Sequence, residues 1–305
     1  MGKRQRINRD QLVGFCLTLP VMIWLLFFLV YPFLNTIVAS FHSRRLGMPG
    51  GPFVGLDIYR YLLTADEQFW AGVSNSVRFT FWSVVLQIVF GLVSAVLLNR
   101  SFRGRAFLRT WIILPWVVPF SVVAIMARWM LSSTFGIVNW VMLNIGLFSS
   151  PVSFLASPQL AMPTAIAVNV YKWFAFVGVM YLAVLQGIPN DLYEAARIDG
   201  SNKLQEFRYI TLPALLPTVG VMSLLMTFWN FNTFGLVWLL TGGGPGMSTT
   251  TLPILVYRRA FQRYRLSEAA ALSVVMFVFL FVYTMIYQRI KDRAEASRES
   301  YGARP

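Results

Sequence analysis

Between two long apolar segments the sequence reads Glu194-Ala195-Ala196-Arg197-Ile198-Asp199-Gly200 and, ten residues later, Ile210-Thr211-Leu212-Pro213. This pattern predicts a helix, a glycine break and a second short helix on the cytoplasmic side of a membrane protein. A short loop that leaves the bilayer and still keeps exposed apolar residues is typical of a surface that binds a partner. Residues 186–212 are called the paired-helix loop below.

Local capping signals support this interpretation of the loop. Asp191 followed by Glu194, and Asn202 followed by Gln205, have the spacing of reciprocal capping boxes at two helix starts. Gly200 is placed to adopt a left-handed conformation at the end of the first helix. An ordinary amphipathic connector between two spans would show the same signals, so capping alone leaves both interpretations open.

The composition indicates a polytopic membrane protein with little catalytic equipment. Of the 305 residues, 57% are apolar and only 12% are charged, which is too little polar surface for a water-soluble protein of this size. The net charge of +14 falls between apolar segments rather than on a basic stripe with stacking aromatics, which argues against nucleic acid as a partner. The single Cys16 and the single His42 leave no set for a disulfide, a metal site or nucleophilic catalysis.

Six windows have the length and apolar character of transmembrane helices. The first follows a basic start but continues beyond the apolar length of a signal peptide, so we interpret it as an uncleaved anchor. The expected fold is therefore all-α with about six spans. The predicted spans are Leu12–Val38, Val77–Leu98, Trp111–Leu131, Ala161–Leu185, Pro213–Leu240 and Ala269–Tyr287.

The distribution of Lys and Arg predicts that both chain ends are cytoplasmic (N-in/C-in). Sixteen of the 26 lie in the two ends and in the connections on one side, and eight lie on the other. The expected organisation is a basic N-terminus over 1–11, a six-helix transmembrane domain over 12–290 that contains the paired-helix loop, and a cytoplasmic tail over 291–305. A short apolar stretch at 135–147 is expected to lie along the outer interface.

The fifth span contains amides among aromatic side chains, which is the kind of lining that suits a sugar. Aromatic faces pack on the C–H faces of sugar rings, and amides form hydrogen bonds with hydroxyls. Simple packing of these rings against neighbouring helices is the alternative. The candidate pathway residues in this span are Asn230, Asn232, Phe228, Trp229 and Phe234, with Asn169 and Gln87 as weaker candidates.

Two charged residues fall inside predicted spans, where an unpaired charge is costly. Lys172, in the outer half of the fourth span and next to Trp173, is expected to line the transport cavity or to extend to the outer interface. We include Lys172 and Trp173 among the pathway candidates. Arg128 lies near the end of its span and is expected to extend to the interface.

The spacing of the paired-helix loop resembles that of the permease subunits of binding-protein-dependent ABC importers. Two further stretches resemble the carbohydrate branch of that family, which includes the maltose permease subunits. They are Leu239-Leu240-Thr241-Gly242-Gly243-Gly244-Pro245 and Phe53-Val54-Gly55-Leu56-Asp57, the latter followed by Tyr59. The chain departs from the larger maltose subunit in having six spans and no large outer domain.

The resemblance implies a type I ABC importer transmembrane domain that contributes half of a translocation pathway. Its partners would be a second permease subunit, a dimer of ATPase subunits and an extracytoplasmic solute-binding protein, in a bacterial inner membrane. ATP and Mg would bind the partner ATPase, since this chain has no phosphate-binding loop. By the same resemblance, the residues that couple to the ATPase would be Glu194, Ala195, Ala196, Asp199, Gly200, Phe207, Ile210, Leu212 and Pro213.

The cargo is less defined than the mechanism. A sugar is expected, and a polyol or a glycerol phosphate compound carried by the same mechanism is the first alternative. An ion-coupled secondary transporter would need carboxylates or broken helices near the membrane centre, and the twelve acids here lie at span ends or in loops. A membrane enzyme ranks last, because no catalytic constellation is present.

Overall fold

A computed structural model describes residues 9–45 and 50–302 of the chain. Four of the basic residues counted above lie outside the described residues: Lys3, Arg4, Arg6 and Arg304. The described part is helical, apart from turns and one isolated β-bridge between His42 and Phe53. It forms two compact units, one over 1–65 and 256–278 and one over 66–255 and 279–305.

The first unit contains the N-terminal span. Its helical run starts at Arg9 and ends at Ser40, so the predicted span Leu12–Val38 is confirmed with slightly wider limits. The apolar side chains described along this run are almost all exposed, as expected for a helix that contacts lipid. Its elements are α1 (Arg9–Leu25), the π-helix η1 (Leu26–Val30), α2 (Tyr31–Ser40) and α3 (Asp57–Thr64).

The first unit also holds an ionic cluster around Glu268. Arg259, only 1% exposed, and Arg265 both pair with this carboxylate. Part of the charge of the basic run at 258–265 is therefore neutralised within the chain. These arginines are thus weaker evidence for which side of the membrane they face. The segments involved are the π-helix η3 (Arg258–Gln262) and the first turns of α14 (Leu266–Gly302).

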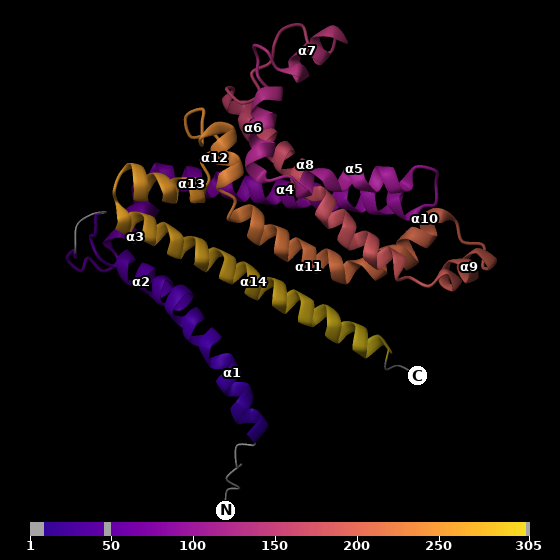
Figure 1. Cartoon of the computed structure of the whole chain (residues 1–305), viewed down its shortest axis with the longest axis horizontal. Helices are drawn as coiled ribbons and strands as arrows, with labels where there is room; N and C mark the ends of the chain where they lie inside the picture. The colour runs from indigo at the N-terminus through magenta and orange to yellow at the C-terminus, as the bar shows by residue number, and fades with distance from the viewer. Residues whose placement is uncertain (1–8, 46–49, 303–305) are drawn as a thin grey trace, which may run out of the picture. The chain divides into compact units, whose positions relative to one another are not determined.

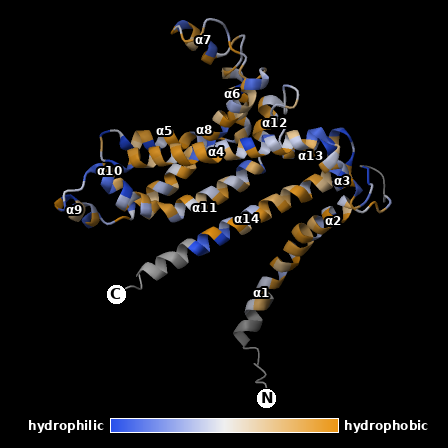
Figure 2. Ribbon diagram, turned by 180° about the vertical axis from the view of Figure 1, so that it is seen from behind, coloured by the Kyte–Doolittle hydropathy of each residue, from blue (hydrophilic) through white to orange (hydrophobic). Residues whose placement is uncertain are grey.

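The second unit holds the remaining helices (Figure 1). Figure 2 shows that the long helices are predominantly apolar in colour, while the short helices α9 and α10 lie in a hydrophilic region. The elements are α4 (Glu67–Asn99), α5 (Arg105–Val117), α6 (Phe120–Met130), α7 (Ile137–Asn144), α8 (Pro158–Gln186), α9 (Asn190–Ile198), α10 (Lys203–Glu206), the π-helix η2 (Phe207–Thr211), α11 (Leu212–Phe231), α12 (Gly235–Thr241) and α13 (Leu252–Tyr257).

Helices α4 and α8 form the centre of the second unit, and small residues let them approach closely. A Cβ atom added to Gly178 of α8 would lie 2.2 Å from Oγ of Ser94, and one added to Gly91 of α4 would lie 2.7 Å from Cγ1 of Val177. Small residues at such crossings allow two backbones to come together, which is how helices associate in membranes. Helix α11 packs on the same pair, and Phe231 at its end stacks on Phe279 of α14.

Two predicted spans are interrupted in the structure. The third, predicted as the continuous segment Trp111–Leu131, consists of α5 and α6 with a bend of 99° between them. The fifth, predicted over Pro213–Leu240, ends as α11 at Phe231 and resumes as α12 at Gly235. In the described residues, five helices have the length and composition to cross a membrane, and the bent pair gives a sixth if it counts as one span.

Candidate functional site

The first helix of the paired-helix loop, α9, starts after Pro189 rather than through a capping box. Pro189 occupies the N-cap position and no side-chain cap hydrogen bond is formed, so the predicted pairing of Asp191 with Glu194 is wrong. The reason is that the helix begins at Asn190 with Pro189 as its N-cap, two residues earlier than an N-cap at Asp191 would require, which moves both side chains out of register. Both carboxylates are solvent-exposed.

The end of α9 follows the prediction. Gly200 has a φ of +83° and its N–H donates to the carbonyl of Arg197, while the N–H of Ser201 donates to Ala196. A Cβ at Gly200 would meet nothing within 4 Å, so the requirement for glycine here comes from backbone conformation and not from crowding.

The second helix begins with the predicted capping box. Oδ1 of Asn202 accepts from the N–H groups of Leu204 and Gln205, and the side chain of Gln205 accepts from the N–H of Asn202 at 2.8 Å. From Lys203 the chain continues without a break through η2 into α11, with Pro213 in its first turn. The short second helix is thus continuous with a long apolar helix.

Two side-chain contacts fix the halves of the loop to one another. Nε of Arg197 lies 2.8 Å from Oε1 of Glu206, and the hydroxyls of Tyr193 and Thr211 lie 2.9 Å apart. The hydrogen bond to Glu206, followed by the charge of that carboxylate, raises the pKa of Arg197 above its ordinary value. The loop therefore has a defined shape without an apolar core of its own.

The loop presents apolar side chains to its surroundings. Ile198 is 86% exposed and Leu204 is 74% exposed, and Tyr209 is also largely exposed. Five of the predicted coupling residues are exposed: Glu194, Ala195, Asp199, Gly200 and Pro213. The other four are half-buried: Ala196, Phe207, Ile210 and Leu212.

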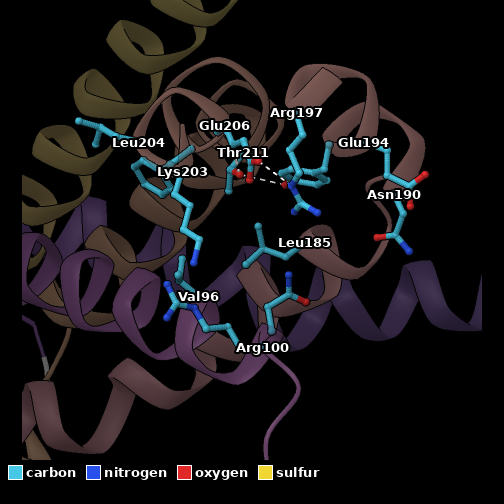
Figure 3. A pocket seen from close by; sticks show the side chains of 13 residues that line it. Val96, Arg100, Leu185, Asn190, Glu194, Arg197, Lys203, Leu204, Glu206 and Thr211 are labelled. Carbon is cyan, nitrogen blue, oxygen red and sulfur yellow. Dashed lines mark hydrogen bonds and ion pairs between the residues drawn. The ribbon is translucent and has the colours of Figure 1, made fainter. Parts of the chain in front are cut away.

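A cavity of about 740 Å³ separates the paired-helix loop from the end of α4 (Figure 3). Its lining includes Arg100 at the C-cap of α4, Lys203 of α10 and Leu185 near the end of α8.

A second cavity, of about 610 Å³, lies where α6, α8, α11 and α12 meet; it is called the aromatic cavity below. Its walls are mainly aromatic, with Trp173 and Trp229 in contact at a ring-centroid distance of 4.9 Å. No charged side chain lines it among the described residues. The lining residues are Phe120, Asn169, Trp173, Leu225, Phe228, Trp229, Asn232, Thr233, Phe234, Gly235 and Leu236.

Behind this cavity, three buried amides form what is called the amide cluster below. Asn230 donates to Oε1 of Gln87 at 2.9 Å, and its own Oδ1 accepts from Asn169 at 2.6 Å and from Gln87 at 3.3 Å. Oδ1 of Asn169 has no hydrogen-bond partner among the described residues, although the side chain is fully buried. Such an unpaired acceptor costs free energy unless something binds it.

The structure brings together most of the predicted pathway residues. Five of them line the aromatic cavity: Asn232, Phe228, Trp229, Phe234 and Trp173. Asn230 lies behind the wall in the amide cluster. Lys172 also lies behind it, at the midpoint of α8 rather than in its outer half, because the helix starts at Pro158.

The sequence interpretation missed the contributions of α6 and α12 to this cavity. Phe120 and Gly235 line it, and the ring of Phe120 packs directly on the Gly235 backbone. The only sequence signal was Pro119, which ends a helix and so permits the bend that directs Phe120 into the cavity. The described residues include no group of three or more His, Cys, Asp or Glu placed to hold a metal ion.

Comparison with known proteins now adds to this geometry. Residues 87–295 match the family described as "Binding-protein-dependent transport system inner membrane component". The chain belongs to this family. It is thus a non-catalytic, multi-pass inner membrane permease component of an ABC importer, which confirms the interpretation made from the paired-helix loop.

Individual relatives agree with this assignment. The chain is 37% identical to the trehalose/maltose transport system permease protein MalF of Thermococcus litoralis, over 88% of this chain and 90% of that protein. It is 34% identical to the sulfoquinovosyl glycerol transport system permease protein SmoG of Agrobacterium fabrum, over 88% and 86%.

Solved structures agree as well. A chain of a bacterial ABC transporter involved in the import of the acidic polysaccharide alginate superposes with a TM-score of 0.83 at 27% identity, covering 94% of this chain and 97% of that one. A chain of a bacterial alginate ABC transporter in complex with an alginate pentasaccharide-bound periplasmic protein superposes with a TM-score of 0.82 at 26% identity, covering 94% of this chain and 96% of that one. This permease family works with a binding protein and with ATP bound on a partner subunit.

Proposed function

We propose that this permease imports a neutral sugar and forms half of the translocation pathway. Its partners would be a second permease subunit, either a homologue or a copy of this chain, two ATPase subunits that bind ATP and Mg, and an extracytoplasmic solute-binding protein. Residues 12–290 would form the permease domain in the lipid bilayer. Residues 1–11 and 291–305 would lie on the cytoplasmic side, together with the paired-helix loop.

The observation that carries the sugar assignment is the chemistry of the aromatic cavity. Its volume of about 610 Å³ is in the range of small-molecule sites, and its lining combines aromatic faces with the amides of Asn169 and Asn232. The exposed side chain of Asn232, which lines the cavity, supplies hydrogen-bonding groups for a hydroxyl of the cargo. Aromatic stacking on ring C–H faces together with a few amide hydrogen bonds is how proteins bind neutral sugars.

The uncharged lining of the cavity favours a neutral cargo over an anionic one. A glycerol phosphate compound or an acidic polysaccharide needs a cation to offset its charge, and none of the described lining residues carries one. The nearby Lys172 has its ammonium engaged elsewhere. A disaccharide such as the trehalose or maltose named for one relative fits this lining, and an uncharged polyol is the alternative that the chemistry leaves open.

The paired-helix loop would receive the force that drives transport. Its exposed residues Ile198 and Leu204 would enter a groove of the ATPase, with Glu194 and Asp199 on the same surface. The continuous helix from Lys203 through α11 would then carry the motion to Phe228 and Trp229 in the cavity wall. The coupling role extends to Ala195, Ala196, Gly200, Phe207, Ile210, Leu212 and Pro213.

Reconstitution of the whole transporter in lipid vesicles tests the cargo assignment. We expect ATP-dependent uptake of labelled trehalose or maltose and little uptake of glycerol 3-phosphate. Trp229→Ala should raise the apparent KM about tenfold, the loss expected for one aromatic wall. The control is Trp82→Ala on α4, an exposed tryptophan outside the cavity, which should leave the KM unchanged. Preferred uptake of the phosphate compound would contradict the proposal.

A further inference from the structure

The bend between α5 and α6 leaves backbone carbonyls without helical partners. The last regular bond of α5 is the one from the N–H of Val118 to the carbonyl of Leu114, and Pro119 begins the next element. Because proline has no N–H, the carbonyl of Pro115, four residues earlier, loses its helical donor. In a membrane interior such groups must find partners within the protein.

Lys172 supplies those partners from a different helix. Its Nζ lies 2.8 Å from the carbonyl oxygen of Trp116, 2.7 Å from that of Val118 and 3.2 Å from that of Pro115. An ammonium group has three hydrogens, so these three contacts account for its whole donor capacity. A cation at a helix C-terminus is also favoured by the helix dipole.

At its position in α8, the Lys172 ammonium has access neither to water nor to a carboxylate of the described residues. The side chain is 4% exposed, and the residue lies 14 positions from both ends of α8, or about 21 Å along the helix at 1.5 Å per residue. The interface is beyond the reach of a lysine side chain from there. Among the described ion pairs, none joins Lys172 to a carboxylate. A buried cation without an acid survives only where several oxygens replace water.

The bend is connected to both walls of the aromatic cavity. Phe120 follows it directly and packs on the Gly235 backbone of α12. On the other side, the ring centroid of Trp173 lies 5.2 Å from Nζ of Lys172, and Trp173 contacts Trp229. A change in the bend would therefore move Phe120 relative to the tryptophan pair.

We propose that Lys172 is a positioning residue which holds the α5–α6 bend through the carbonyls of Pro115, Trp116 and Val118, and so sets the shape of the cavity. It does not contact the cargo. The three carbonyl oxygens at the bend stabilise its positive charge. The lining of the aromatic cavity therefore stays uncharged. This role is independent of which cargo is carried.

Spin labels across the bend test the proposal in the assembled transporter. In a Cys16→Ser background, cysteines introduced at Phe107 of α5 and Met126 of α6, both exposed, carry the labels. We expect a single narrow distance distribution in the parent and in Lys172→Arg, which keeps charge and donors. Lys172→Met should give a broad one. The control, Tyr171→Met, changes an exposed neighbour on the same helix and should leave the distribution narrow.

Transport kinetics separate this role from cargo binding. With maltose as the probe, Lys172→Met should lower the turnover about tenfold or more, in line with losing charge-assisted hydrogen bonds, while the KM changes little. A narrow distribution in Lys172→Met, or a raised KM at normal turnover, would overturn the inference. If that variant does not assemble, Lys172→Arg decides, because it keeps the charge and the donors. It is expected to assemble with a narrow distribution, and a broad one would also count against us.

Discussion

The paired-helix loop and the aromatic cavity are built in opposite ways. The loop comes from one continuous stretch, is held by caps and two side-chain contacts, and exposes Ile198 and Leu204. The cavity is assembled from α6, α8, α11 and α12, which come from three separate stretches of the sequence, and buried amides that bond to one another lie next to it. A surface that receives force has to be accessible and stable by local means, whereas a cargo site needs long-range packing.

The largest effect should follow from breaking the amide cluster. Asn230→Leu removes the partner of both Gln87 and Asn169 and leaves two buried amides unsatisfied, which should cost about 2–4 kcal/mol of stability. Thermal unfolding in detergent measures this, and uptake should be lost with it. The control is Asn232→Leu, because Asn232 donates only to the carbonyl of Phe228 in its own helix, so stability should change little. Equal destabilisation by both variants would show that the cluster is not a unit.

A smaller and purely functional effect is expected at Gly200. Gly200→Val places a β-branched side chain at a φ of +83°, which costs about 1–2 kcal/mol locally and reshapes the loop. Uptake should fall about tenfold, while insertion and thermal unfolding stay near those of the parent. Gly187→Val at the end of α8 is the matched control, because Gly187 has an ordinary φ of −84°. If both valines had the same effect on uptake, backbone conformation at Gly200 would not be the cause.

The prediction with the smallest effect concerns the pair formed by the exposed Arg197 and the half-buried Glu206. Arg197→Gln should reduce uptake less than about twofold, because an ion pair with one partner in water contributes little. The raised pKa of Arg197 means that its favourable contribution is fully present below the ordinary arginine pKa and is lost only above the raised value. Uptake measured from neutral to mildly alkaline pH should therefore show no loss from this group. A tenfold drop would mean that the pair contacts the ATPase directly.

The same contrast explains what the sequence could predict. The loop was predictable because Gly200 and the Asn202 capping box act on neighbouring residues. The exception was Asp191, because the helix starts two residues earlier than a cap at this position requires. The spans were predictable from apolar length. The bend at Pro119 and the end of α11 at Phe231 were not, since the partners that stabilise them come from other helices, as Lys172 does.

The residues that line the aromatic cavity could be predicted only in part. Asn232 and Trp229 were recognisable because polar and aromatic residues within a span are conspicuous. Phe120, Leu225 and Leu236 look like any membrane residue in sequence, and only the meeting of α6, α11 and α12 makes them part of a site.

The most direct test of the account links the two regions in one experiment. In the assembled transporter with Cys16→Ser, a cysteine introduced at Thr233 of the aromatic cavity is labelled with a water-soluble maleimide, with and without ATP and vanadate. We predict that the nucleotide changes the labelling rate several-fold, and that Gly200→Val abolishes this change while leaving the rate without nucleotide unaltered. A nucleotide response of the same size in Gly200→Val would contradict the claim that the paired-helix loop drives the cavity.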